Sequence, residues 1–324
     1  MVKIRKIRRT LKEMTKLLFI GDIHGKAINP LKRLCSYNED LFAKLEWIRD
    51  YANENKIDAV VHLGDIFDKP EATDEWKNKF IQIWKQYNGK FYSIIGMLHD
   101  LFYNNEQSYV KTCLYNLELS GVLKVIDNTT ITIGDVELVS LNMRTKEAKK
   151  QLVAIPKSSS KYQIILAHQF YEWDLDKSAG FTEDEVSSID HDCSLILGHD
   201  HRQHSTEHVN HVDIYRPGSL MRTELSETTI EQKPRVLLFD DGSFNYIEVP
   251  HKSIQEIYDV ANYRVTKSTA KAFRNIKNNL ADVSKYLHTD TTVKTCSEAL
   301  KELKCPSAEF NYLKTVHQMS GLEF

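Results

Sequence analysis

The sequence predicts an α/β protein in which mixed β-sheets form a sandwich flanked by helices, followed by a small helical C-terminal domain. Three observations lead to this prediction. Apolar β-rich runs alternate with helical patterns from residue 17 to about 120, β-rich runs alone continue to residue 249, and only helical patterns follow Pro250. The first of these patterns is typical of sheets whose loops gather at the carboxyl ends of the strands.

We expect three parts: a basic extension at 1–16, a main domain at 17–250 and a small helical domain at 251–324. The 324 residues suffice for one large domain and a small one. With 41% hydrophobic and 27% charged residues, the composition excludes a disordered or collagen-like chain. No apolar run approaches the roughly 18 residues that a membrane-spanning helix needs, so we expect no membrane segment.

Strands and helices alternate in the first half of the main domain. Strands at 17–20, 58–63 and 91–95 are followed directly by GDIHG, GDIFD and GMLHD. Apolar side chains recur at helical spacing over 39–54 and 73–87. Each of these three strands therefore leads into a loop that carries Asp or His.

The second half of the main domain contains β-rich runs, and turn residues such as Gly134 and Gly242 separate them. The predicted strands are 122–126, 130–133, 136–141, 162–168, 193–197, 212–219, 235–240 and 244–249. The predicted C-terminal helices are 252–262, 268–288, 293–303 and 307–318.

The cysteines and the N-terminal end bear on the compartment. The five cysteines form no C-x-x-C pair, which favours reduced thiols in the cytoplasm over a disulfide framework, and we expect all five to be packing residues. Residues 1–16 carry seven Lys or Arg and one Glu, and no apolar segment of signal-peptide length follows. We interpret them as a solvated basic segment rather than a phosphate-backbone contact.

Asp and His side chains follow five of the predicted strands, and a single sheet would bring them to one edge. A lone His at a strand end is usually structural, whereas five such clusters indicate a metal site. Carboxylates and imidazoles are ligands for Mn, Fe or Zn. Two ions about 3.5–4 Å apart, bridged by a carboxylate, can hold phosphate oxygens for in-line attack. The residues are Asp22, His24, Asp65, Asp68, His99, Asp100, His168, His199, Asp200 and His201.

Taken in order, these motifs resemble the calcineurin-like metallophosphoesterases over about residues 17–250. Three further stretches resemble the SbcD-like branch of DNA-repair exonucleases, which includes phage recombination nuclease subunits. These stretches are GDIFDKP (64–70), HDLFYNN (99–105) and RPGSLMRTE (216–224). The resemblance implies a four-layer sandwich in which mixed sheets are flanked by helices.

The resemblance also implies a role for each motif residue. Asp22, His24 and His201 would hold the first metal, Asp65 would bridge, and His168 and His199 would hold the second metal. His99 would protonate the leaving oxygen or stabilise the charged transition state, which suits an imidazole near neutral pH. Asp100 could orient His99.

The third loop departs from the family's Gly-Asn-His-Asp/Glu pattern. It reads Gly96-Met97-Leu98-His99-Asp100, so the Asn that gives its carbonyl oxygen to the second metal is missing and one residue is extra. Met sulfur is a soft ligand and does not replace that oxygen for a hard ion, so the second site would be weak. Three interpretations stay open: retained chemistry with a looser second metal, a subunit that only binds DNA or a partner, and an altered local sequence. We favour the first, because the other metal residues are present.

Three residues outside the motif are candidates for contacts with nucleic acid. Arg216 and Arg222 could donate to phosphates or could be ordinary surface charge. Tyr103 could line a nucleic-acid groove or belong to a turn. His62 lies inside a strand and is expected to pack. We expect a polar surface loop rather than a third metal at His191, His204, His208 and His211.

The function implied by the resemblance is that of a manganese-dependent DNA exonuclease or endonuclease subunit, with Mg, Fe or Zn as other metals. It would hydrolyse phosphodiesters in DNA repair, recombination or replication. Its partner would be an SbcC-like coiled-coil ATPase, and a homodimer is one possible assembly. Its location would be the cytoplasm, or the host cytoplasm for a phage-encoded chain. Within 261–288, six basic residues and one acidic residue could cover DNA or dock a partner. The alternatives are a small-molecule phosphatase or phosphodiesterase and a catalytically weakened DNA-binding or assembly subunit.

The net charge of −2 is a sum of unlike parts. The extension at 1–16 carries +6, the residues from 251 onward carry +3, and the main domain between them carries −11. Bound divalent ions would offset part of that negative charge. Near-neutrality therefore does not count against a DNA substrate.

Overall fold

The computed structural model describes residues 15–263 apart from 27, 31, 98 and 173–176. The chain divides into two compact units, residues 1–258 and 259–324, and the fold described here is that of the first. The basic extension up to residue 14 and the helices expected beyond 263 lie outside the described residues.

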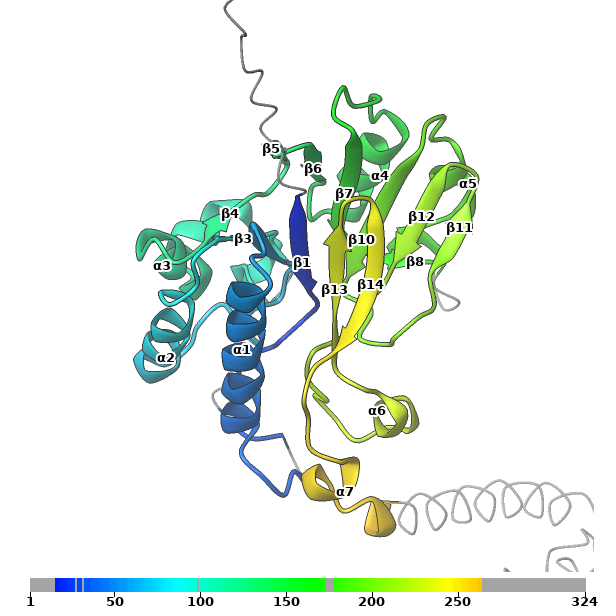
Figure 1. The fold of residues 1–324 in the computed structure, drawn as a ribbon. Coiled ribbons are helices and arrows are strands. Elements are labelled where there is room, and N and C mark those ends of the chain that lie inside the picture. The colour runs from blue at the N-terminus through cyan, green and yellow to red at the C-terminus, as the bar shows by residue number, and fades with distance from the viewer. Residues whose placement is uncertain (1–14, 27, 31, 98, 173–176, 264–324) are drawn as a thin grey trace, which may run out of the picture. The chain divides into compact units, whose positions relative to one another are not determined.

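Two six-stranded mixed sheets form the centre of the first unit (Figure 1). The first sheet has the order β14-β13-β1-β2-β3-β4, in which β1 to β4 run parallel and β13 pairs antiparallel with both β1 and β14. Its strands are β1 (Lys16–Ile20), β2 (Ala59–His62), β3 (Lys90–Ser93), β4 (Lys124–Val125), β13 (Arg235–Asp240) and β14 (Ser243–Glu248).

The second sheet has the order β11-β12-β10-β7-β6-β5, and its inner strands β12, β10, β7 and β6 are parallel. Its strands are β5 (Thr129–Ile133), β6 (Val136–Ser140), β7 (Tyr162–His168), β10 (Cys193–Gly198), β11 (Glu207–Val209) and β12 (Val212–Tyr215). A two-stranded ribbon consists of β8 (Phe170–Tyr171) and β9 (Gly180–Phe181).

Helices cover the outer faces of both sheets. None of the helices in the described part of the chain has the length and apolar character needed to span a membrane. The α-helices are α1 (Tyr37–Glu54), α2 (Asp74–Trp84), α3 (Cys113–Leu119), α4 (Thr145–Val153), α5 (Glu183–Ser187), α6 (Glu227–Glu231) and α7 (Ile254–Ile257). Three short 3₁₀ helices are η1 (Phe102–Asn104), η2 (Glu106–Lys111) and η3 (Lys177–Ala179).

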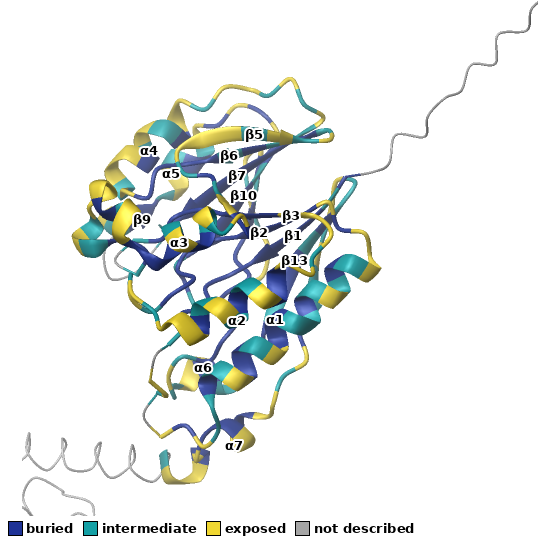
Figure 2. Ribbon diagram, turned by 90° about the vertical axis from the view of Figure 1, so that its left-hand side faces the viewer, coloured by how far each residue is buried: buried dark blue, intermediate teal, exposed yellow. Residues whose placement is uncertain are grey.

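Alternation along the central strands builds a four-layered core. In β1, Leu18 and Ile20 pack toward α1 and α2, while Leu17 and Phe19 pack toward the second sheet. The other face of the second sheet packs against α4 and α5. Figure 2 shows the central strands buried between helices whose outer faces are exposed, whereas the edge strand β5 is largely exposed. Strands buried on both faces need continuous apolar runs, which is why LLFI and AVV are uninterrupted. The predicted α/β sandwich of mixed sheets is confirmed.

Two expectations about the elements need correction. The motif loops leave strands of two sheets rather than one, with β1, β2 and β3 in the first sheet and β7 and β10 in the second. The sequence predicts only strands between residue 122 and Pro250, yet α4, α5 and α6 interrupt them. These helices are short and bury few residues (in α4, Ala148 and Leu152), so their apolar positions repeat too few times to indicate a helix.

Candidate metal centre

The loops after β1, β2 and β10 converge through backbone hydrogen bonds. The His24 N–H donates to Asp65 O (3.0 Å), and the His199 N–H donates to Asp22 Oδ1 (3.1 Å). His24 (φ 44°), Asp65 (φ 59°) and His199 (φ 82°) all have left-handed backbone conformations, which are uncommon for residues other than Gly. Such conformations cluster at functional sites, where the surrounding structure holds them.

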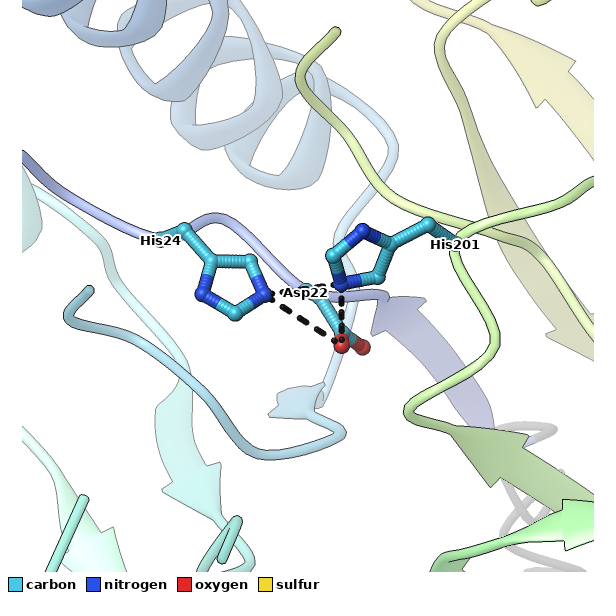
Figure 3. A group of neighbouring side chains, drawn as sticks. All are labelled: Asp22, His24 and His201. Atoms are coloured by element: carbon cyan, nitrogen blue, oxygen red, sulfur yellow. Dashed lines mark hydrogen bonds and ion pairs between the residues drawn. The ribbon is translucent and has the colours of Figure 1, made fainter. Parts of the chain in front are cut away.

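Asp22, His24 and His201 form the first group of metal-ligating atoms (Figure 3). The Nε2 atoms of His24 and His201 lie 2.8 Å apart, and they lie 3.7 and 3.3 Å from Asp22 Oδ2. Asp22 and His24 come from the end of β1, and His201 comes from the loop after β10. Two imidazoles and a carboxylate facing one point are a ligand set for a first-row divalent metal.

Asp65, His168 and His199 form a second such group. His168 Nδ1 donates to Leu63 O (2.7 Å), so Nε2 is the atom presented to Asp65 Oδ2 at 3.2 Å. A backbone carbonyl that fixes the tautomer in this way is typical of metal-binding histidines. Asp65 Oδ2 also lies 3.7 Å from His24 Nε2, so the Asp65 carboxylate stands between the two groups.

The protonation states of the second group follow from burial and charge. Burial would raise the pKa of Asp65, but the charges of His168 and His24 outweigh it and bring the pKa to about 2. Burial would lower the pKa of His168, but Asp65 and Asp22 raise it to about 10. For His199, burial and the neighbouring His168 charge lower the pKa to about 4. The proton on His168 thus balances the charge of the ionised Asp65 carboxylate, and a bound cation would displace that proton.

The first group also has an ionised carboxylate. Burial would raise the pKa of Asp22, but His168, His201 and His24 outweigh it and hold the pKa well below its usual value. Asp22 Oδ2 and Asp65 Oδ1 are buried and accept no hydrogen bond from the described residues. Buried ionised oxygens without donors are costly unless a cation binds them. The residues present therefore fit a pair of divalent metal ions.

His99 lies beside the first group. Its ring meets the His24 ring edge to face, with centroids 4.6 Å apart, and a third set of candidate ligand atoms joins it to His24 and Asp65. The His99 Nδ1–H donates to the main-chain oxygen of Asp68 (2.7 Å). The Asp68 carboxylate in turn pairs with Lys26. Sequence reasoning assigned no role to Asp68 or Lys26, although Asp68 lies within the GDIFD motif.

Asp100 does not orient His99. It is fully buried, and its Oδ2 accepts the N–H groups of Asp65 (2.9 Å) and Gly96 (2.8 Å). Burial and the nearby Asp65 carboxylate raise the pKa of Asp100 to about 7. A Cβ on Gly96 would come within 1.8 Å of Asp65 Oδ1, so the third loop passes very close to the metal-binding carboxylate. Asp100 thus holds the second and third loops together.

The three candidates for nucleic-acid contacts lie in very different surroundings. Arg222 is 5% exposed, and its guanidinium donates to the main-chain oxygens of Gln232 and Lys252. Arg216 is equally buried, pairs with Glu207 and packs over the Tyr171 ring. Both arginines therefore lie inside the fold rather than face solvent, and partners within the chain hold them, although Nε of Arg216 is buried without a hydrogen-bond partner among the described residues.

Tyr103, by contrast, is 93% exposed. It follows His99 in the third loop, and both Tyr103 (φ 55°) and Asn104 (φ 52°) have left-handed backbone conformations. These conformations are unfavourable for side chains other than Gly and mark a loop held in a specific shape.

The other histidines considered as candidates each have a hydrogen-bond partner among the described residues. His62 is fully buried in β2, where its Nδ1 accepts the Gly64 N–H (3.2 Å) and burial lowers its pKa to about 3. It is thus a packed, neutral residue. His204, His208 and His211 each donate to an Asp side chain, and His191 contacts Gln163. Among the described residues, none of these four joins a group of candidate metal ligands.

A cleft of about 700 Å³ opens beside the metal centre. Asp65, His99, His199 and His201 are among the residues that line it. Its lining also includes residues of the loop 200–204 and of the segment 223–232, which contains α6. A volume of this size is typical of a ligand-binding pocket.

A family model and one sequence relative agree with this chemistry. The family model for calcineurin-like phosphoesterases matches residues 15–203. A Sulfolobus acidocaldarius protein described as DNA double-strand break repair protein Mre11 is 26% identical over 285 residues, covering 83% of this chain and 72% of that protein. Among solved structures, a Thermus thermophilus protein aligns with a TM-score of 0.47 at 12% identity, covering 73% of this chain and 100% of that one. A dimetal phosphatase from Danio rerio aligns with a TM-score of 0.46 at 13% identity, covering 73% and 99%.

Proposed function

The chain belongs to the calcineurin-like phosphoesterase family and is a hydrolase of phosphoester bonds, and from this premise we propose that its substrate is DNA. The observation that carries the DNA assignment is the similarity to Mre11, a protein of double-strand break repair, over 83% of the chain. The stretches that resemble the SbcD-like branch support the same assignment. The proposed activity is exonuclease or endonuclease cleavage in repair, recombination or replication.

The proposed centre holds two divalent ions. Asp22, His24 and His201 would bind the first ion, His168 and His199 would bind the second, and Asp65, which stands between the groups, would bridge them. In such a centre the ions polarise phosphoryl oxygens and activate water. The mixture of imidazoles and carboxylates favours Mn²⁺, with Mg, Fe or Zn as other occupants.

His99 is the proposed proton donor to the leaving oxygen. Its Nδ1–H is committed to Asp68 O, which leaves Nε2 as the nitrogen for proton transfer. Fixing the ring through the main chain of the GDIFD loop also fixes it relative to Asp65 in the same loop. Asp100 contributes through its hydrogen bonds to the Asp65 and Gly96 amides rather than by contact with substrate. The missing motif Asn at Met97 would leave the second ion with fewer ligands.

The partner, the assembly and the location are proposed on the same basis. An SbcC-like coiled-coil ATPase suits a subunit similar to Mre11, and a homodimer suits the same branch. Residues 251–324 would form the capping or partner-binding domain. The absence of a C-x-x-C pair among the five cysteines supports the cytoplasm, or a host cytoplasm for a phage-encoded chain.

A second candidate is a phosphatase or phosphodiesterase acting on a small molecule. The observation in its favour is the cleft itself, because Glu224 and Glu231 in its lining would repel a polyanion that filled it. This candidate uses the same metal ligands and differs only in what the cleft holds.

The test compares substrates under identical Mn²⁺ conditions. Linear duplex and single-stranded oligonucleotides are incubated with the full chain, in parallel with nucleoside monophosphates and p-nitrophenyl phosphate. We expect cleavage of DNA and binding that weakens steeply with salt. Hydrolysis of the monoesters without any cleavage or salt-sensitive binding of DNA would replace the nuclease with the small-molecule enzyme.

A further inference from the structure

Asp200 organises two basic side chains next to the metal centre. It is 5% exposed, and it accepts hydrogen bonds from Arg202 Nε (2.9 Å), Arg202 Nη2 (2.8 Å) and His204 Nε2 (2.9 Å). The main-chain N–H of Arg202 also donates to Asp200 (3.1 Å). A guanidinium bound through two nitrogens to a buried carboxylate loses little further freedom when it meets a ligand.

Arg202 nevertheless remains open to solvent. Its side chain is 46% exposed, whereas the carboxylate that holds it is buried. The two hydrogen bonds from Arg202 Nε and Nη2 to Asp200 therefore fix the Arg202 guanidinium at the surface.

The position of this arrangement ties it to catalysis. Arg202 directly follows His201, a residue of the first metal-binding group, and His199 and His201 flank Asp200. Arg202 and His204 line the same cleft as His99 and Asp65. A group that occupies the cleft while its phosphoester lies at the metal centre would thus come within reach of Arg202.

The residues that line the cleft differ in charge. Arg202 and His204 are basic, whereas Glu224 and Glu231 are acidic and Thr223 and Thr228 carry hydroxyl groups. A phosphate is attracted to a guanidinium and repelled by carboxylates, so a nucleic-acid phosphate in the cleft would lie nearer to Arg202 than to the two glutamates. Hydroxyl and amino groups of sugars and bases would suit the glutamates, because carboxylates accept hydrogen bonds from them.

We propose that Arg202, positioned by Asp200 and supported by His204, binds the phosphate adjacent to the scissile phosphodiester of a DNA strand. This assignment rests on the proposed nuclease function and specifies one subsite of it. The requirement for a neighbouring phosphate distinguishes a polynucleotide from a small phosphoester. It also gives the enzyme a reason to prefer internal or phosphorylated positions of a strand.

The first experiment adds a single phosphate to a minimal substrate. Hydrolysis of the dinucleotide TpT is compared with that of pTpT and TpTp, in the parent and in Arg202→Gln. A charge-assisted hydrogen bond contributes about 1.5–3 kcal/mol, so one added phosphate is expected to raise kcat/KM roughly 10- to 100-fold in the parent. In Arg202→Gln this gain should fall close to one, and Arg202→Lys should recover part of it.

The matched control is Arg49→Gln. Arg49 pairs with Asp50 in the same bidentate way, through Nε (2.8 Å) and Nη2 (2.9 Å), but it lies on α1 and does not line the cleft. This variant should keep the full gain from the added phosphate. Metal content is measured for every variant, and loss of metal from Arg202→Gln would overturn the proposal by showing that Arg202 supports His201 instead.

The second experiment needs no turnover and separates the subsite from the proposed function. Binding of a single-stranded oligonucleotide is measured over a range of salt concentrations. Loss of one phosphate contact lowers the slope of log Kd against log salt by about 0.7 for a single strand. A slope in Arg202→Gln equal to that of the parent, or an undiminished gain from the added phosphate, would overturn the proposal. Failure of the parent to cleave any DNA while the slope still falls would refute the nuclease and leave the subsite standing.

Discussion

His99 is the residue whose surroundings say most about the reaction. Its hydrogen bond to Asp68 O and its edge-to-face contact with His24 fix the ring beside the metal-binding residues. A fixed imidazole with one free nitrogen is suited to general acid catalysis. Its partner is a main-chain carbonyl, which no side-chain motif reveals, and this is why the sequence pointed to Asp100 instead.

Replacing His99 by Gln tests this role. We expect kcat for DNA to fall by roughly 10²- to 10⁴-fold, the usual contribution of a positioned proton donor, while the metal content is retained. His208→Gln serves as control, because His208 is exposed and pairs with Asp213. Cleavage by His99→Gln at the rate of the control would show that another group protonates the leaving oxygen.

Tyr103 offers a stacking surface for a base. Its 93% exposure and left-handed backbone hold an aromatic ring in solvent four residues after His99. Stacking on an aromatic side chain contributes about 1–3 kcal/mol per base, so Tyr103→Ala should weaken binding of single-stranded DNA about 5- to 150-fold. Fluorescence anisotropy measures this, and Tyr103→Phe should bind like the parent. Equal affinity of the Ala variant would place Tyr103 outside the DNA path.

At the scale of single residues, the sequence predicted candidate metal ligands because each of them follows an apolar strand, and the structure brings these candidates into groups. It could not predict the fate of Arg216 and Arg222, because the same arginine can serve a phosphate or a backbone carbonyl. Only the three-dimensional neighbours, Gln232 and Lys252 for Arg222, decide between the two. Arg202 was not predicted as a site residue. The buried carboxylate that holds it, Asp200, belongs to the metal motif, and the sequence does not show their hydrogen bonds.

Among the elements, the loop after β3 is the one whose sequence departs from the family. Gly96 approaches Asp65 so closely that no side chain fits there, and Asp100 ties the loop to the Asp65 amide. Because this loop lies so close to Asp65, we expect the loss of the family's Asn from it to affect the second metal ion directly. Leu98 lies outside the described residues.

Replacing Met97-Leu98 with a single Asn restores the family's length and ligand. We expect tighter Mn²⁺ binding by titration calorimetry and faster cleavage of DNA, because a hard oxygen ligand joins the second site. Met97→Ala, which keeps the loop length and adds no oxygen, is the control. A restored loop that binds metal and cleaves DNA no better than the parent would show that this loop does not limit the centre.

Helix α1 holds a buried charged cluster that anchors the end of the first unit. Asp40 Oδ2 and Oδ1 accept from Arg33 (2.6 Å) and Lys44 (2.6 Å), all within the interior. Arg33 also donates to Arg222 O and packs over the ring of Tyr258, the last residue of the unit. This network joins α1 to the segment that leads into residues 259–324.

Removing the shared carboxylate should be costly. Asp40→Ala leaves two buried cations without their partner, which typically costs about 3–5 kcal/mol. Thermal unfolding of this variant is compared with that of Asp50→Ala, which removes an exposed carboxylate from the same helix. A melting temperature of Asp40→Ala no lower than that of Asp50→Ala would mean that the cluster does not stabilise α1.

The strands and the two long helices of the first half followed from periodicity. The helices α1 and α2 begin near their predicted starts because Ser36 and Thr73 cap them, each accepting a main-chain N–H. The short helices α4, α5 and α6 did not follow, because one or two turns give too few repeats to separate a helix from a loop.

For the whole molecule, the decisive feature is the meeting of two sheets. The first sheet supplies Asp22, His24 and Asp65, and the second supplies His168 and His199. The sequence showed that each cluster ends a strand but not which sheet that strand joins, because register and sheet membership depend on long-range pairing. The hydrophobic core between the sheets holds the two parts of the candidate metal centre together.

The central claim is a two-metal centre that hydrolyses DNA, and metal content measured together with cleavage tests it most directly. The metal-free chain is titrated with Mn²⁺, and bound ions per chain and cleavage of linear DNA are followed in the same samples, for the parent, Asp65→Asn and the control Asp213→Asn. We predict that the parent and the control bind two ions and cleave as the second ion binds, whereas Asp65→Asn binds at most one ion and does not cleave. Cleavage by Asp65→Asn at the parent's rate, or cleavage of DNA by the metal-free chain, would contradict the account.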